Sequence, residues 1–280
     1  MRVTNEQIRS YQENGFFVLP QYFSKKEVEI MRAELPPIFA EQSLRRVKER
    51  DGDVVRSVYG SHKTNNVFEK LARHPRIVEP AMQLLGSGVY VYQFKINCKA
   101  AFGGDMWEWH QDYVFWRKED GLPQARITNV VVFLNEVNEF NGPLFVIPGS
   151  HKEGSFDVQP RDGDPDGKVR QSQQYKDSPA WISNLTADLK YSLNRELVVE
   201  LVNRYGIDAP KGPAGSVLFF HCNLAHGSSN NISPFDRTVV IISFNSVENA
   251  PGVVESPRPE FLASRDTSPI VPVPDDALLH

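Results

Sequence analysis

The stretch "VYVYQFKIN" (residues 89–97) marks the point at which the sequence changes from helical periodicity to short strand-like runs. The later runs have β-branched or aromatic residues with Gly, Pro or Asn at their borders, and they are "ITNVVVFLNEV" (127–137), "GPLFVIPGS" (142–150), "GSVLFFHCN" (215–223) and "RTVVIISFNSV" (237–247). Segments of this kind are typical of β-strands. Several of them after a helical part predict a mainly β fold with flanking helices, a β-barrel or jelly roll.

The N-terminal part, about residues 1–85, has mostly helical features. Thr4-x-x-Gln7 and Ser24-x-x-Glu27 are capping-box patterns placed before helical periodicity. Between them, "GFFVLP" (residues 15–20) is a short apolar run that ends at proline, which predicts a strand. We therefore expect helices, with one strand between them, to pack on the outside of the β-structure.

A long polar insertion, about residues 152–190, interrupts the strand pattern. It is rich in Gly, Asp and Gln, and residues 161–167 are the most Gly-Asp-rich part. An insertion of this length is either a mobile lid or a disordered excursion. The segment "NRELVVELVNRYG" (194–206) then predicts an amphipathic helix that stops at Gly206. No internal repeat or linker divides the chain, which predicts a single domain over residues 1–280.

Composition restricts the class of protein. The net charge of −4 is spread along the chain and makes no basic face, which argues against a nucleic-acid partner. Two cysteines, Cys98 and Cys222, are too few for a disulfide framework and predict free thiols. The first residues lack the apolar core of a signal peptide, and no apolar run approaches the roughly 20 residues of a membrane span. We expect a cytoplasmic protein without a membrane partner.

The stretch "WEWHQDYVFW" (107–116) places His110 and Asp112 two residues apart among aromatic residues. In an extended strand, residues i and i+2 project from the same face. An imidazole and a carboxylate at one spot provide two of the three protein ligands of a metal site. A His–Asp hydrogen bond at a strand end is the alternative, and the pair alone does not decide between them.

The segment "FFHCNLAHGSSNNISPFDR" (219–237) offers a third ligand in His226, with His221 nearby. Arg237 follows His226 by eleven residues, a distance that suits a hairpin returning past the metal. Two histidines and one carboxylate on one face are the ligand set of non-haem Fe(II) oxygenases. An arginine there can bind a carboxylate through two parallel hydrogen bonds, which predicts a dicarboxylate co-substrate, 2-oxoglutarate. Catalytic zinc is the alternative, but it leaves the arginine without a role.

The motifs "WHQDY", "GPLFVIPGSHK" and "HGSSNNISPFDR" resemble those of the phytanoyl-CoA dioxygenase family of Fe(II)/2-oxoglutarate enzymes. "VYQFKINCKA", "WEWHQDYVFWRKEDG" and the tail "PRPEFLASRD" are most similar to bacterial hydroxylases of free L-proline at the trans-4 position, in the ectoine-hydroxylase-like branch. The resemblance implies a double-stranded β-helix of the jelly-roll (cupin-like) type. It also implies hydroxylation with Fe(II), 2-oxoglutarate and O2, supported by ascorbate.

The resemblance also assigns roles to residues. It implies that the metal ligands are His110, Asp112 and His226, and that Arg237 binds the distal carboxylate of 2-oxoglutarate with the help of Asn97 and Ser228. It implies a substrate pocket that is lined by Gln93, Trp107, Trp116 and Phe220. Trp107 and Ile241 stand where the ectoine enzymes carry Phe, which weakens the prediction of ectoine. The carboxylate of Asp112 favours hydroxylation over halogenation, because halogenating relatives carry a small residue there.

The expected substrate is a small free amino acid, with L-proline to trans-4-hydroxy-L-proline as the first choice. Ectoine, pipecolic acid, another amino acid and a carrier-bound residue are the alternatives. Trp116, Trp107 and Phe220 can pack against the proline ring, although an aromatic cluster can also be ordinary core. The candidate cations for the substrate carboxylate are Arg117, Arg126 and Lys95. A jelly-roll binding protein without metal has no use for the four residues His110, Asp112, His226 and Arg237. His221 receives no role.

Overall fold

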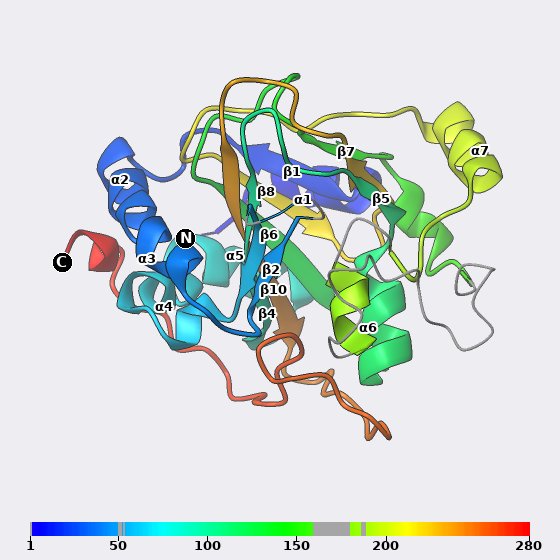
Figure 1. The fold of residues 1–280 in the computed structure, drawn as a ribbon. Coiled ribbons are helices and arrows are strands. Elements are labelled where there is room, and N and C mark those ends of the chain that lie inside the picture. The colour runs from blue at the N-terminus through cyan, green and yellow to red at the C-terminus, as the bar shows by residue number, and fades with distance from the viewer. Residues whose placement is uncertain (1, 50–51, 53, 159–179, 186–188) are drawn as a thin grey trace.

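The computed structural model describes residues 2–280 except 50–51, 53, 159–179 and 186–188 (Figure 1). Its centre is a seven-stranded antiparallel sheet, and a second sheet has three antiparallel strands. The strands of the large sheet are, in spatial order, β1 (Phe16–Leu19), β8 (Val217–His221), β6 (Ile127–Phe133), β10 (Arg237–Ser246), β4 (Val89–Lys99), β3 (Val55–Tyr59) and β2 (Arg46–Lys48). Those of the small sheet are β5 (Trp107–His110), β9 (His226–Ser228) and β7 (Leu144–Val146). The expected mainly β jelly roll is confirmed.

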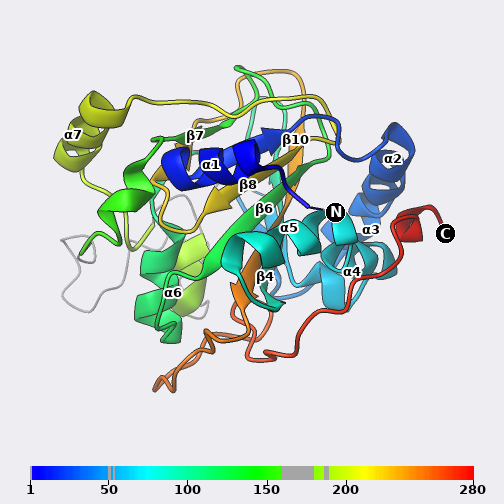
Figure 2. The ribbon, with the colours of Figure 1, turned by 180° about the vertical axis from the view of Figure 1, so that it is seen from behind.

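Helices flank the sheets. The α-helices are α1 (Asn5–Asn14), α2 (Lys25–Ala33), α3 (Leu35–Ala40), α4 (Asn66–Ala72), α5 (Pro75–Leu85), α6 (Asp112–Asp120) and α7 (Arg195–Tyr205). The short 3₁₀ helices are η1 (Ser61–Lys63), η2 (Ser150–Glu153), η4 (Ala180–Leu185) and η5 (Ala277–Leu279). Figure 2 shows α1 and α5 in front of the large sheet. Of the helices that the structure describes, none is long and apolar enough to span a membrane.

Both faces of the large sheet are covered, which explains its nearly continuous apolar strands. Alternate residues of a strand project to opposite faces. In β6, Val130 and Val132 pack in a core cluster with Ile77 of α5, whereas Val131 and Phe133 belong to a second cluster on the inner side. The helices therefore seal the outer face with hydrophobic contacts. The inner face is left to form the wall of an internal pocket.

Local signals place the N-terminal elements. Thr4 and Ser24 each accept a hydrogen bond from the third residue of the following helix, and both capping boxes are complete. The predicted strand in "GFFVLP" is β1, which pairs with β8. The part up to residue 85 is less helical than predicted, because β2 and β3 extend the large sheet there. They are short, and the three residues "RVK" of β2 are too few for their alternation to predict a strand.

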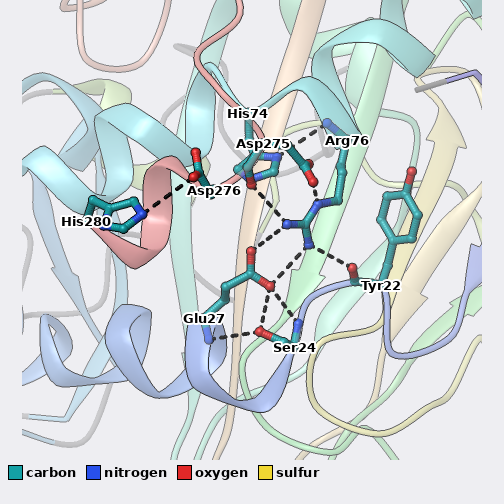
Figure 3. Close-up of polar contacts among 8 residues, drawn as sticks. All are labelled: Tyr22, Ser24, Glu27, His74, Arg76, Asp275, Asp276 and His280. Atoms are coloured by element: carbon teal, nitrogen blue, oxygen red, sulfur yellow. Dashed lines mark hydrogen bonds and ion pairs between the residues drawn. The ribbon is translucent and has the colours of Figure 1, made fainter.

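The C-terminal segment returns to the N-terminal helices (Figure 3). Arg76 of α5 donates to Glu27 of α2 at 2.6 Å and to Asp275 at 2.7 Å. A ring nitrogen of His74, Nε2, lies 3.0 Å from the main-chain oxygen of Asp275. These contacts fix the end of the chain against α2 and α5, and none of the residues drawn in Figure 3 lines the pocket described below.

The insertion and the segment after it are described in part. The helix predicted at 194–206 is α7, with Asn194 as its N-cap and Gly206 at its C-terminus. The Gly-Asp-rich residues 161–167 lie outside the described residues. The described end of the insertion includes η4, and Leu185 and Leu189 from that end line the internal pocket.

Candidate active site

The two residues of the His-x-Asp pair lie on different elements. His110 is the last residue of β5, Gln111 is the N-cap, and Asp112 is the first residue of α6. The prediction that one extended strand carries both is therefore wrong. The turn from strand to helix still brings the groups together, with His110 Nε2 3.7 Å from Asp112 Oδ1.

His226 completes the cluster from the neighbouring strand. It begins β9 and stands directly opposite His110 in the antiparallel register. His226 Nε2 lies 3.8 Å from Asp112 Oδ2, and one ligand atom from each of the three residues lies within 4.8 Å of the others. All three side chains are buried. In the described part of the chain, this is the one group of three or more His, Cys, Asp or Glu residues that could hold a metal ion.

The orientation of the imidazoles fits a metal. His110 Nδ1 lies 2.6 Å from the carbonyl oxygen of Glu108, and His226 Nδ1 lies 2.9 Å from that of Leu224. Because a carbonyl oxygen only accepts, each Nδ1 carries the hydrogen and each Nε2 keeps a lone pair that faces Asp112. Burial, with repulsion from His110, lowers the pKa of His226 to about 3, so this imidazole is neutral as a ligand must be.

The carboxylate of Asp112 is held ionised and oriented. Burial opposes its charge, but the positive charge of Lys95 helps to keep the pKa of Asp112 well below its usual range. Asn129 of β6 donates from Nδ2 to Asp112 Oδ2 at 2.9 Å, and Ser243 donates to Asn129 Oδ1 at 2.6 Å. One carboxylate oxygen is therefore fixed by a chain of buried groups from two adjacent strands.

Arg237 begins β10 and is buried. The expected hairpin is wrong, because β9 belongs to the small sheet and β10 to the large one, so the connection crosses between sheets. Arg237 Nη2 donates to the carbonyl oxygen of Gly142, whereas its Nε has no partner. Asn97 Oδ1 and Ser228 Oγ are also buried without a partner. Buried polar atoms are rarely left unpaired, so these three fit a bound polar ligand. The Arg237 N–H and the Ser228 hydroxyl can donate to a carboxylate, whereas Asn97 Oδ1 only accepts.

One pocket between the two sheets collects the predicted residues. Its lining includes the metal-ligand cluster and all seven other residues that the sequence predicts for the site, which are Gln93, Asn97, Trp107, Trp116, Phe220, Ser228 and Arg237. Gln93, Asn97 and Arg237 come from β4 and β10, Phe220 from β8, Trp116 from α6, and Trp107 and Ser228 from the small sheet. The pocket is therefore apolar on several sides, with polar groups at the cluster and at Arg237.

Comparison with known proteins identifies the family. A profile of phytanoyl-CoA dioxygenase (PhyH) matches residues 11–239. The chain belongs to the phytanoyl-CoA dioxygenase family. It is a non-haem dioxygenase that uses Fe(II) and 2-oxoglutarate, and His110, Asp112 and His226 form the His-Asp-His cluster of that class.

Curated relatives of this dioxygenase match over almost the whole chain. An L-proline trans-4-hydroxylase from Streptomyces griseoviridis is 38% identical over 96% of this chain and 95% of its own. An ectoine dioxygenase from Streptomyces avermitilis is 36% identical over 96% of this chain and 88% of its own. The crystal structure of EctD from S. alaskensis with 2-oxoglutarate and 5-hydroxyectoine has a TM-score of 0.80 at 31% identity, covering 97% of this chain and 87% of that one. Its structure with bound Fe has a TM-score of 0.77.

The pocket lining distinguishes the three candidate partners of the substrate carboxylate, Lys95, Arg117 and Arg126. Lys95 lines the pocket, whereas Arg117 is exposed on α6 and Arg126 pairs with Glu248 at 2.6 Å, and neither arginine lines it. The sequence analysis missed a further lining cation, Arg258, which donates to Asp120 at 2.8 and 2.5 Å. Arg258 lies in the tail "PRPEFLASRD", which carries part of the family resemblance. The motif therefore contained the residue but did not indicate that it lines the pocket.

Two other residues complete the comparison with the sequence. The sequence analysis also missed Tyr59, a buried residue of β3 that lines the pocket. His221 does not line the pocket; its ring contacts those of Tyr11 and His151. Burial lowers the pKa of His221 to about 4, so it is a neutral side chain of the interior.

Proposed function

We propose that this dioxygenase hydroxylates free L-proline at the trans-4 position and converts 2-oxoglutarate to succinate and CO2. The observation that carries the proposal is the buried His110, Asp112 and His226 cluster in one pocket with Arg237 and aromatic side chains. The full-length match to an L-proline trans-4-hydroxylase supports the choice of substrate. Trp107 and Ile241, which differ from the residues expected in ectoine hydroxylases, support it as well.

In this proposal, His110, Asp112 and His226 hold the iron. Arg237 binds the distal carboxylate of 2-oxoglutarate, the unpartnered hydroxyl of Ser228 donates to the co-substrate, and Asn97 donates from its amide nitrogen. When bound, iron with 2-oxoglutarate and O2 supplies an oxidant strong enough to replace a C–H bond by C–OH. The protein must therefore select the carbon by position alone.

Pocket side chains position the substrate. Trp116, Trp107 and Phe220 pack against the apolar ring face, and an aromatic face also attracts the substrate ammonium. Gln93 donates from Nε2 to the carbonyl oxygen of Leu262 at 2.7 Å, which fixes its amide at the wall of the pocket.

Lys95 and Arg258 are the cations of the pocket that the substrate carboxylate can meet. The Lys95 ammonium makes no hydrogen bond to any residue that the structure describes, whereas the Arg258 side chain is already bonded to Asp120. Lys95→Met and Arg258→Lys distinguish them, because the variant that removes the carboxylate partner raises the KM for the amino acid much more than the other. If the two variants raise it equally, the carboxylate uses both.

We propose that the insertion, about residues 152–190, acts as a lid over a single-domain enzyme. Leu185 and Leu189, from its described end, line the pocket and support this role. A lid excludes water from the reacting groups. Deleting residues 160–170 should increase 2-oxoglutarate consumption without product. Coupling that is unchanged in that deletion would count against the lid.

The test of the function is a substrate panel under air with Fe(II), ascorbate and 2-oxoglutarate, with succinate measured for L-proline, ectoine and pipecolic acid. L-proline should give the largest succinate formation, and mass spectrometry and NMR should identify trans-4-hydroxy-L-proline. Ectoine is the second candidate, because several relatives of 34–36% identity are ectoine dioxygenases. Succinate formation that depends on ectoine or pipecolic acid and ignores proline would replace the proposed substrate.

A further inference from the structure

A buried ion pair lies beside the pocket, between Arg56 of β3 and Glu49, the residue that follows the edge strand β2. Arg56 of β3 is 1% exposed and donates from Nη1 to Glu49 at 2.9 Å. Moving two charges out of water costs hydration energy, and the attraction between the charges often does not offset that cost. A buried pair is therefore weak evidence for stability, and its other contacts indicate what it does.

Those contacts converge on Trp107. The guanidinium carbon of Arg56 lies 3.8 Å from the centre of the Trp107 ring, which is close face contact. Arg56 also donates to the main-chain oxygens of Asp105 at 3.3 Å and Met106 at 3.0 Å, the two residues before Trp107. Glu49 accepts from the main-chain N–H of Asp105 at 3.2 Å. The pair thus holds both the ring and the backbone that leads to it.

The strand that carries Trp107 does not fix the ring by itself. β5 has four residues, and its register with β9 shifts between Trp107 and His110. Such an irregularity re-aims side chains and interrupts the ladder. Trp107 stands opposite Ser228, and both line the pocket. Trp107 is half-buried at the margin of the core cluster that contains Phe115 and Trp116, so this core contacts the ring without enclosing it.

We infer that Arg56 is a positioning residue that, with Glu49, holds the Trp107 ring as a wall of the substrate pocket. Arg56 is absent from the pocket lining and acts through Trp107. The consequence for the amino-acid substrate rests on the proposed function, and the position of the ring does not. An ion pair that served stability alone would not need the face of a pocket residue.

Arg56→Lys is the central variant, because it keeps the charge beside Glu49 and loses the planar contact with the ring. We expect the KM for L-proline to rise about 3-fold to 10-fold, the loss of one cation–aromatic contact. Binding of 2-oxoglutarate to the anaerobic Fe(II) enzyme, read from its charge-transfer absorption, should change less than about 2-fold. This split between substrate and co-substrate would not arise from general destabilisation.

Trp107→Phe makes a double-mutant cycle possible. If Arg56 acts through Trp107, the variant with both substitutions should have a KM within about 2-fold of Trp107→Phe alone. Effects that multiply would overturn the inference. Near-ultraviolet circular dichroism gives a readout without substrate, since Arg56→Lys should remove the same band as Trp107→Phe.

Arg76→Lys is the matched control. Arg76 pairs with buried Glu27 (Figure 3). Its guanidinium carbon lies 5.1 Å from the centre of the Phe23 ring, and neither Arg76 nor Phe23 lines the pocket. Arg76→Lys should lower the unfolding temperature without changing the KM for L-proline or the near-ultraviolet band. An Arg56→Lys variant that behaves like this control would contradict the inference. If wild-type protein hydroxylates no amino acid, the proposed function fails, and the dichroism band still decides whether Arg56 holds the ring.

Discussion

Replacing Asn129 by alanine should weaken iron binding although Asn129 is not a ligand. Asn129 is fully buried in β6 and donates to Asp112 Oδ2 at 2.9 Å. Its own Oδ1 accepts from Ser243 at 2.6 Å, so the amide cannot turn away. The substitution removes the donor to one carboxylate oxygen and leaves the carboxylate of Asp112 free to rotate.

The magnitude follows from the charge of the acceptor. A hydrogen bond to a charged group contributes about 1.5–3 kcal/mol. Partners of metal ligands typically change metal affinity or activity by about 10-fold to 100-fold, which is about 1.4–2.7 kcal/mol. The two estimates agree, and we expect the Fe(II) affinity of Asn129→Ala to fall about 10-fold to 100-fold.

The assay is an anaerobic Fe(II) titration in the presence of 2-oxoglutarate, followed by the charge-transfer absorption. Asn245→Ala is the matched control, because Asn245 is a fully buried amide of β10 that donates to Tyr90 and to the carbonyl of Asn249. Asn245→Ala should lower the free energy of unfolding by an amount similar to Asn129→Ala and leave the Fe(II) affinity unchanged. Equal iron affinities of Asn129→Ala and Asn245→Ala would refute the role given to Asn129.

Three further predictions test other parts of the account. Arg237→Met should weaken 2-oxoglutarate binding at least about 30-fold in the same anaerobic titration, since truncating a buried charge partner costs about 2–5 kcal/mol; an unchanged affinity would exclude Arg237 as its partner. Burial lowers the pKa of His62 and of His221 to about 4. Below pH 6.5 the unfolded chain therefore binds more protons at these histidines than the folded protein does. The free energy of unfolding should fall by roughly 1–2 kcal/mol per histidine between pH 7 and 5. Urea unfolding of His221→Asn should show a smaller fall than the wild type. Asp120→Asn should destabilise the metal-free protein by about 3–5 kcal/mol, because it leaves Arg258 buried without its charge partner, and an unchanged urea midpoint would contradict this.

The inner strands of the large sheet and the starts of α1 and α2 were predictable because their signals are local. Thr4 and Ser24 mark helix starts within four residues, and the β-branched runs mark the inner strands. The change from β5 to α6 between His110 and Asp112 was not predictable. Gln111 is a poor N-cap residue whose side chain makes no capping bond, and the surrounding aromatic residues suit a strand as well as a helix.

The residue types pointed to the metal-ligand cluster and Arg237, although the single strand and the hairpin that their spacing suggested were wrong. The family resemblance supplied the rest of the predicted lining. The groups that hold these residues could not be found in this way. Asn129, Arg56 and Arg258 act on partners 17, 51 and 138 positions away, at Asp112, Trp107 and Asp120. Such pairs form only when separate segments of the chain become neighbours in the fold, and no periodicity or motif in one segment specifies them.

The most direct test of the central claim is one reaction with Fe(II), ascorbate, 2-oxoglutarate and L-proline under ¹⁸O-labelled oxygen gas. We expect equal amounts of succinate and trans-4-hydroxy-L-proline, with one labelled oxygen atom in each. Succinate formation without any hydroxylated amino acid would agree with the proposed iron chemistry and contradict L-proline as the substrate. No succinate from iron-loaded protein with proline, ectoine or pipecolic acid would contradict the account as a whole.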